Sequence, residues 1–284
     1  MTEIQEAILE IYKVVRDICI KNEINYFAIG GTCLGAVRHE GFIPWDDDMD
    51  IAVPIEDFYR FKEMCKKELP YYYVVYDSDF EVMYPNVFIK IVDIRTTVVE
   101  QGYRNIPELF EGVYVDVMPI AGVPCDTKER KKYFRKLKYN ISLNKLRRAG
   151  LLLSKSPLKR GIKRILRIII KIKNIDAFTK RMYEAMEQRP FYESQYTGYT
   201  WDLYDGKALS FPTDWFKETI ELPFEDSKMI CPKEYDKYLS YQFDKYMELP
   251  PEEERGTRHA YFVDLKKSYK HYQTHPGDVC FGEP

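Results

Sequence analysis

The sequence lacks the short-range spacings of cysteine and histidine that hold structural metal ions. Its six cysteines are scattered, and no two of them form a Cys-x-x-Cys pair. His259 aside, the histidines give no metal-ligand spacing. These absences argue against a zinc knuckle and against a disulfide framework. They predict reduced thiols, as in a cytoplasmic protein.

The chain also lacks the features of export and of membrane insertion. The N-terminal stretch MTEIQEAILEIYKVV carries acids where a signal peptide needs positive charge. No apolar run reaches the length that spans a bilayer. We therefore expect a cytoplasmic protein, with any membrane contact peripheral and at the inner face of the cell membrane.

Three common ligand-binding motifs are missing from the stretch between Ile29 and Val53, which holds four of the fourteen glycines and four aspartates in five positions. The spacing after Gly30 does not continue to the Gly-Lys of a Walker loop, and the dinucleotide fingerprint Gly-x-Gly-x-x-Gly is absent. The aspartates of DDDMD match the first ligands of an EF-hand loop. The sixth position of that loop must be glycine, however, and here it is Ile51.

The composition is that of a globular protein with unevenly distributed charge. Hydrophobic residues make up 45% of the chain, which is enough for a sizeable core. The formal net charge is only −2. Residues 128–173 nevertheless contain eighteen lysines and arginines and one acid, a net +17 that leaves about −19 on the rest. Such asymmetry predicts an anionic partner for the basic segment.

Hydrophobic periodicity predicts both helices and strands. Apolar residues at helical spacing predict amphipathic helices over 3–21 and 55–68. From 127 to about 188 the pattern is helical and basic, and further helices are expected near 232–247. Short apolar runs predict strands, and these are 26–31, 49–53, 71–76, 86–92, 96–100 and 112–120. The mixture indicates an α+β fold.

Alternation within the aspartate cluster suggests a metal site. In an extended chain Asp46, Asp48 and Asp50 project to one side, while the residues between them project to the other. Three carboxylates on one side repel unless a cation lies among them, and Mg²⁺ or Mn²⁺ suits hard oxygen ligands. The alternative for an isolated DDDMD is an aspartate-rich turn that caps a strand. The preceding pair Gly30–Gly31, which lets the backbone approach a ligand closely, favours the metal site.

The stretch GGTCLGAVRHEGFIPWDDDMDI resembles the LicD-type phosphocholine transferase family, a branch of the nucleotidyltransferase superfamily related to fukutin. The resemblance continues in IVDIRTT, in GVYVDVMPIAGVP and in YDKYL…YMELPPEEE…H, so that it spans roughly residues 3–262. It implies a nucleotidyltransferase-like mixed β-sheet core flanked by helices over 1–125. A basic helical insertion over 126–190 follows. A C-terminal extension over 191–284 would pack on the core and complete the site.

The resemblance implies metal-dependent transfer of a phospho-alcohol, most of all phosphocholine. The donor would be a CDP-alcohol and the acceptor a hydroxyl of a lipid-linked cell-surface glycan or teichoic acid precursor, with release of CMP. A third carboxylate on a neighbouring strand falls on Asp116, which interrupts an apolar run where an unpaired charge is costly. Asp48, Asp50 and Asp116 would then be catalytic, with Asp46 as a further metal ligand. Asp116 is the preferred proton acceptor.

Other residues are implied as substrate contacts. The backbone of Gly30, Gly31 and Thr32 would cradle the phosphates. Arg38, His39 and Lys90 could stabilise phosphate charge. Arg38 and His39 taken alone are more often surface residues, and the Lys90 side chain could instead extend to solvent.

Two further residues match the resemblance without a clear chemical role. His259 coincides with a C-terminal histidine of the family, and a structural role is expected for it. Trp45 could stack on a base, but packing against the strand is expected.

The basic segment contains a second pattern. Over residues 155–173 an apolar stripe from Leu158 to Ile172 faces a row of lysines and arginines, as in a helix that lies on an anionic membrane. The alternative is a helix that covers the core with solvated lysines outside. Nucleic acid is not expected as a partner, because aromatic residues are not interleaved with the charge.

Two other functions stay open. A nucleotidyltransferase that attaches a nucleoside monophosphate to a small molecule would use the same carboxylates. A non-catalytic membrane- or RNA-binding protein would use only the basic segment. Nothing in the residues decides between choline, ribitol and glycerol as the alcohol.

Overall fold

A computed structural model describes residues 1–77, 84, 86–148, 162, 165, 176–199, 210–256 and 259–279. Helix α1 (Glu3–Lys21) follows a capping box, in which the Gln5 amide donates to Thr2 Oγ1 and the Thr2 amide donates to Gln5 Oε1. Its buried face includes Ile8, Ile11 and Val15, so the helix predicted over 3–21 is confirmed.

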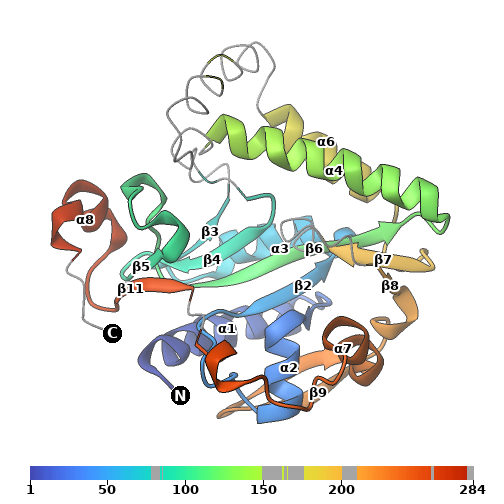
Figure 1. The fold of residues 1–284 in the computed structure, drawn as a ribbon, viewed down its shortest axis with the longest axis horizontal. Coiled ribbons are helices and arrows are strands. Elements are labelled where there is room, and N and C mark those ends of the chain that lie inside the picture. The colour runs from blue at the N-terminus through green and yellow to red at the C-terminus, as the bar shows by residue number, and fades with distance from the viewer. Residues whose placement is uncertain are drawn as a thin grey trace.

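The central sheet has seven strands, and a single parallel pair joins β2 to β6. The strand order is β1-β2-β6-β4-β3, with β7 beside β6 and β8 beside β7. This mixed sheet confirms the predicted α+β, nucleotidyltransferase-like class (Figure 1). The strands are β1 (Phe27–Ala28), β2 (Asp50–Pro54), β3 (Tyr73–Tyr76), β4 (Ile89–Asp93), β6 (Tyr114–Val123), β7 (Tyr196–Tyr199) and β8 (Phe211–Pro212).

Strand β6 organises the sheet because both of its edges are paired. Residues 116–120 pair with β2 on one edge. On the other edge residues 114–117 pair with β4, and residues 120–123 pair with β7. All ten residues of β6 are buried, as expected for a strand enclosed on both sides.

The helices flank the sheet. Helix α3 (Ile55–Glu68), which matches the helix predicted over 55–68, packs with α1 against the strands. The two glycines expected to end a strand over 26–31 instead begin helix α2 (Gly30–His39), because β1 already ends at Ala28. Helices α4 (Thr127–Arg148) and α6 (Asp176–Glu187) pack together on the opposite side of the sheet from α2 (Figure 1).

The C-terminal part adds a hairpin, two helices and an edge strand. The hairpin β9 (Thr219–Phe224) and β10 (Ser227–Pro232) packs beside β1 and α2, and α7 (Tyr235–Phe243) also contacts α2. Strand β11 (Ala260–Asp264) pairs with β5 (Thr97–Glu100), and α8 (Tyr269–Thr274) follows it. Short 3₁₀ turns lie at Gln101–Tyr103, Pro107–Leu109, Thr213–Trp215, Glu252–Glu254 and Pro276–Asp278.

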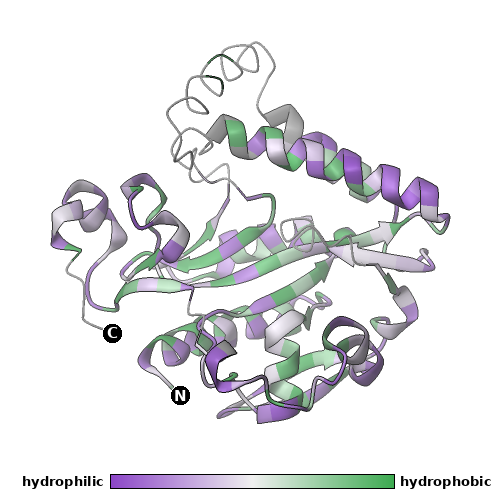
Figure 2. Cartoon of the chain, viewed as in Figure 1, coloured by the Kyte–Doolittle hydropathy of each residue, from purple (hydrophilic) through white to green (hydrophobic). Residues whose placement is uncertain are grey.

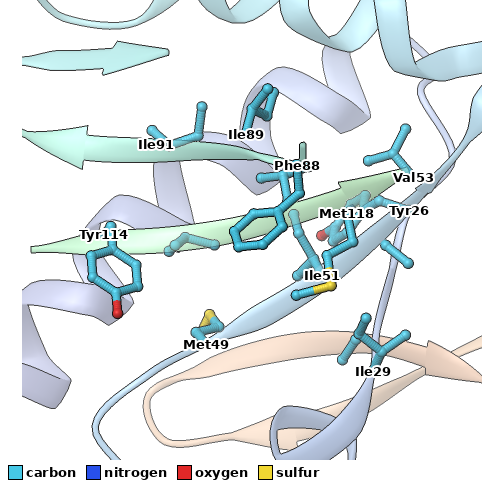
Figure 3. Packing of buried hydrophobic residues seen from close by; sticks show 14 of the residues in the cluster. Tyr26, Ile29, Met49, Ile51, Val53, Phe88, Ile89, Ile91, Tyr114 and Met118 are labelled. Atoms are coloured by element: carbon cyan, nitrogen blue, oxygen red, sulfur yellow. The ribbon is translucent and has the colours of Figure 1, made fainter. Parts of the chain in front are cut away.

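A large hydrophobic core joins the sheet to its helices. Met49, Ile51 and Met118 belong to it, and Figure 3 shows these side chains around β2 and β6. Figure 2 shows hydrophobic residues concentrated in the central strands, whereas much of α4 is hydrophilic. Burial of this apolar surface is the main favourable term for folding.

Helix α4 presents a basic outer face. Its buried residues Phe134, Leu137 and Ile141 recur at helical spacing, and exposed lysines and arginines lie between them. The helix predicted over 155–173 lies outside the described residues except for Ile162 and Ile165, which are helical and 52% and 62% exposed. Among the described helices, none is long and apolar enough to cross a membrane.

Candidate active site

Three charged residues lie in one row across three adjacent strands. Asp50 of β2 is the register partner of Asp116 of β6, and Asp116 is in turn the partner of Lys90 of β4. Residues paired in register point to the same face of a sheet. The topology therefore places two carboxylates and one ammonium side by side, although they are 26 or more positions apart in the sequence.

The aspartates before β2 alternate as predicted, although the strand itself begins only at Asp50. Asp46 and Asp48 point toward one another, while Asp47 and Met49 between them are buried. The backbone here is held by β6, because the Asp116 amide donates to the Met49 carbonyl at 2.9 Å. Alternation therefore directs Asp46, Asp48 and Asp50 to one side.

The start of helix α2 faces these carboxylates. Each of its first three residues suits its position for a different reason. Gly30 has φ of +55°, a conformation that favours glycine. A Cβ on Gly31 would lie 2.8 Å from Asp46 Oδ2, so only glycine leaves room for that carboxylate. The Thr32 hydroxyl accepts a hydrogen bond from the Asp50 amide at 2.8 Å, which ties the helix to β2.

The donor atoms fit a divalent cation. One ligand atom each of Asp46, Asp48 and His259 lies within 4.8 Å of the others. Asp116 Oδ1 is buried and has no hydrogen-bond partner among the described residues. Carboxylate oxygens with an imidazole are ligands that Mg²⁺ or Mn²⁺ can share, so these residues could hold a metal ion.

Burial, and after it the charges of neighbouring carboxylates, raises the pKa values of the cluster. Burial, and after it the charge of Asp48, raises the pKa of Asp46 to about 8. Burial raises the pKa of Asp50 well above its usual value, and the charges of Asp48, Asp116 and Asp46 add to this effect. Burial likewise raises the pKa of Asp116, although Lys90 opposes the shift. The charges are therefore costly unless a cation joins them.

Comparison with known proteins points to one family. The sequence model described as "LicD/FKTN/FKRP, nucleotidyltransferase domain" matches residues 23–119, which include the row and the start of α2. We call this matched stretch, residues 23–119, the LicD domain.

The matched relatives differ in how much of this chain they cover. The lipopolysaccharide cholinephosphotransferase LicD of Haemophilus influenzae is 28% identical over 264 residues, which is 91% of this chain and 96% of its own. An uncharacterized protein of Rickettsia typhi is 40% identical over 24% of this chain and 23% of its own. One of Rickettsia prowazekii is 31% identical over 29% of this chain and 39% of its own.

Lys90 lies deep in the LicD domain, where its ammonium contacts protein carboxylates. Its ammonium contacts Glu111, Glu100 at 3.2 Å and Asp116 at 3.8 Å, and it lies 3.3 Å from the centre of the Tyr114 ring. Its three N–H groups thus face three carboxylates. We therefore reinterpret Lys90 as the fixed cation that balances Asp116, in place of the predicted direct contact with phosphate.

Arg38 and His39 are not brought to the carboxylates. They lie at the far end of α2, about 12 Å along the helix axis from Gly30. Arg38 donates to the carbonyl of Tyr246 at 2.7 Å and to His39 Nε2 at 2.9 Å. This pair ties the LicD domain to the C-terminal segment, and its predicted phosphate contact stays a prediction.

Sequence reasoning missed the residues that close the site from the C-terminal side. Asp47 accepts the amides of His259 and Ala260 at 2.9 and 2.8 Å. The Tyr238 hydroxyl of α7 accepts the Gly30 amide at 2.8 Å. The alternation could have predicted that Asp47 points to the side opposite Asp46 and Asp48. No local pattern, however, indicates partners more than 200 positions away.

Replacing Lys90 tests the buried charge balance. We expect Lys90→Met to lower the free energy of unfolding by about 3–5 kcal/mol, because it leaves the buried carboxylates of Glu111 and Asp116 and the half-buried Glu100 without their cation. Urea unfolding of the metal-free protein measures this change. Adding Glu111→Gln should restore part of the loss. Lys67→Met is the control, since the exposed Lys67–Glu63 pair is worth under about 1 kcal/mol. A Lys90 variant no less stable than that control would contradict the assignment.

The raised pKa of Asp46 predicts a pH-dependent stability. The native carboxyl keeps its proton to about pH 8, whereas in the unfolded chain it is lost near about pH 4. The associated stability is therefore present below about pH 4 and falls as pH rises toward about pH 8. Melting curves recorded in chelator should show this fall in the wild type and a smaller fall in Asp46→Asn. Each kcal/mol of lost stability lowers the melting temperature by about 2–4 °C. Equal pH slopes would contradict the raised pKa.

Proposed function

We propose that the protein transfers a phospho-alcohol, phosphocholine in the first place, from a CDP-alcohol to a hydroxyl of a cell-surface glycan precursor and releases CMP. The observation that carries this proposal is the row of Asp50, Asp116 and Lys90, which faces the start of α2 beside Asp46 and Asp48. The likeness to the Haemophilus influenzae cholinephosphotransferase over 91% of the chain supports it.

The start of α2 is suited to bind the pyrophosphate of the donor. The positive end of a helix dipole favours phosphate, and the first amides of a helix have no partner within it. Gly30 gives its amide to Tyr238, so the amides of Gly31 and Thr32 remain for phosphate oxygens. A divalent cation held by Asp46, Asp48 and the open carboxylates would neutralise phosphate charge there.

Asp116 is the residue placed to accept a proton. Its pKa is raised by burial, which brings its basicity closer to neutral pH. The acceptor hydroxyl would give its proton to Asp116 while its oxygen bonds to the phosphorus that carries the alcohol. The bond between that phosphorus and the bridging oxygen breaks, and CMP leaves with the electron pair. Lys90 holds Asp116 at 3.8 Å throughout.

A cleft beside Asp46 favours choline among the possible alcohols. It has a volume of about 220 Å³, and its lining includes Trp45, Tyr261 and Phe262 together with Asp46 and Asp47. Aromatic faces and carboxylates attract a quaternary ammonium group. No lysine or arginine is among the described residues that line this cleft, although Arg255 and Arg104 lie 5.6 Å from the ring centres of Trp45 and Tyr261, respectively. Ribitol and glycerol would need a ring of hydrogen-bonding groups.

The two alternative functions fit the site less well. A nucleotidyltransferase would share the carboxylates but would need a triphosphate donor and would release pyrophosphate. A non-catalytic binding protein has no use for the buried carboxylates Asp50 and Asp116, whose mutual repulsion destabilises the metal-free fold. The arrangement therefore supports an enzyme.

The basic face of α4 is suited to contact an anionic membrane that carries the acceptor. Six of its cations are exposed and form no ion pair with another described residue, whereas Arg130 is half-buried and bonded to Ser210. Tyr139 on the same helix is 63% exposed. The exposed cations are Lys128, Lys131, Lys132, Arg135, Lys136 and Lys138.

A donor panel tests the proposed reaction. Purified protein with Mg²⁺ or Mn²⁺ and a lipid-linked glycan should release CMP from CDP-choline faster than from CDP-ribitol or CDP-glycerol, and chelator should stop the release. Asp50→Asn should lower turnover about a thousandfold, because a metal ion contributes several kcal/mol. The control Asp214→Asn alters an aspartate that is 83% exposed and should leave turnover unchanged. Pyrophosphate release from CTP would support the nucleotidyltransferase instead.

Vesicle binding tests the basic face. We expect the protein to sediment with phosphatidylglycerol vesicles at low salt and less as salt rises, because each nearby cation contributes about 1 kcal/mol. Replacing Lys131, Lys132 and Arg135 with glutamate should weaken binding about a hundredfold or more.

A charge-matched control separates location from net charge. The same exchange at the exposed residues Lys217, Lys237 and Lys245 should have little effect on vesicle binding. A wild type that ignores anionic vesicles at low salt would refute the membrane contact.

A further inference from the structure

His259 reaches the carboxylates from outside the part of the chain that matches the LicD domain. Its Nε2 lies 3.8 Å from Asp48 Oδ2, and its side chain is 50% exposed, whereas that of Asp48 is 18% exposed. The imidazole therefore stands at the mouth of the site. Asp50 and Asp116 lie at the bottom of the site, since their backbones lie within the sheet.

The backbone of His259 is held on both sides. Asp47, which is only 8% exposed, accepts the amides of His259 and Ala260. On the other side the His259 carbonyl accepts the Gln101 amide at 2.9 Å, next to the pairing of β11 with β5. Holding the amide and the carbonyl of one residue leaves only its side chain free to turn. Asp47 is thus a positioning residue for the imidazole.

The metal site needs more than the three carboxylates that alternate along the chain. Asp46, Asp48 and His259 each offer one ligand atom within 4.8 Å of the others. Independently, Asp116 Oδ1 is buried without a hydrogen-bond partner. That oxygen lies 3.8 Å from the Lys90 ammonium, so the cation site is marked by Asp46, Asp48 and His259.

We propose that His259 is a nitrogen ligand of the catalytic cation, together with Asp46 and Asp48, and that it selects Mn²⁺ over Mg²⁺. The proposal rests on the metal-dependent function proposed above. Imidazole suits transition-metal ions, whereas Mg²⁺ prefers oxygen ligands and keeps several waters. An all-carboxylate site would show little preference, so selectivity follows from the one nitrogen that the C-terminal segment adds.

Metal titration tests the selectivity without any donor or acceptor. Free Mn²⁺ is followed by its electron paramagnetic resonance signal during titration of the metal-free protein, and Mg²⁺ is added as competitor. His259→Ala should weaken Mn²⁺ binding about tenfold or more and change Mg²⁺ binding much less, so that the affinity ratio falls. His275→Ala is the matched control, because His275 is exposed and lies at the end of α8. Equal losses for both ions would overturn the proposal.

Pulsed paramagnetic resonance of the Mn²⁺-loaded protein reports the ligand directly. A bound imidazole gives nitrogen modulation, which should be present in the wild type, persist in His275→Ala and vanish in His259→Ala. A wild type that binds Mn²⁺ without nitrogen modulation would overturn the proposal, even if His259→Ala folds poorly. Nitrogen modulation without CMP release from any donor would leave the ligand assignment intact and refute only the proposed reaction. A wild type that binds neither ion would refute both.

The role of Asp47 gives a second readout. Asp47→Asn removes one acceptor oxygen and the charge that hold the amides of His259 and Ala260. It should lower the Mn²⁺ to Mg²⁺ affinity ratio in the wild type but have no further effect on the ratio in His259→Ala. An independent effect of Asp47→Asn in the His259→Ala background would show that Asp47 acts on the carboxylates and not through the histidine.

Discussion

Repulsion between buried carboxylates is the constraint on which the rest of the structure depends. Asp50 and Asp116 are neighbours because the parallel pairing of β2 with β6 sets them in register. Their charges cannot separate without breaking that sheet, so the surroundings must supply positive potential. Lys90 does so from the next strand, and the start of α2 does so through its amides. A bound divalent cation, as proposed above, would supply further positive charge where these carboxylates meet.

The C-terminal segment is tied to the LicD domain around the candidate site. Asp47 holds the backbone of His259, Tyr238 accepts the Gly30 amide, and Arg38 donates to the carbonyl of Tyr246. Each tie joins a residue of the matched region 23–119 to one more than 200 positions away. Because these contacts surround the phosphate-facing end and the far end of α2 alike, changes in the C-terminal segment alter the site without touching its carboxylates.

Local sequence patterns predicted the features of the fold that depend on residues close together in the sequence. Helices α1 and α3 and most strands follow from periodicity, and alternation correctly directed Asp46 and Asp48 to one side. Helix α2 escaped notice because a double glycine is a poor helix start, and packing against β9, β10 and α7 stabilises it instead. The partners of Lys90 and the place of His259 could not be predicted, since both depend on strand pairings that no local signal specifies.

The distribution of charge links the site to the surroundings proposed for it. The donor is an anion, yet outside residues 128–173 the chain carries about −19. An anionic donor therefore approaches against the overall field, and the local cation at the carboxylates must reverse that field over a few ångströms. In the proposed membrane contact the same asymmetry would act, because an anionic surface would attract α4 and repel the acidic body. A protein held in this way would turn the acidic part of its surface away from the lipid.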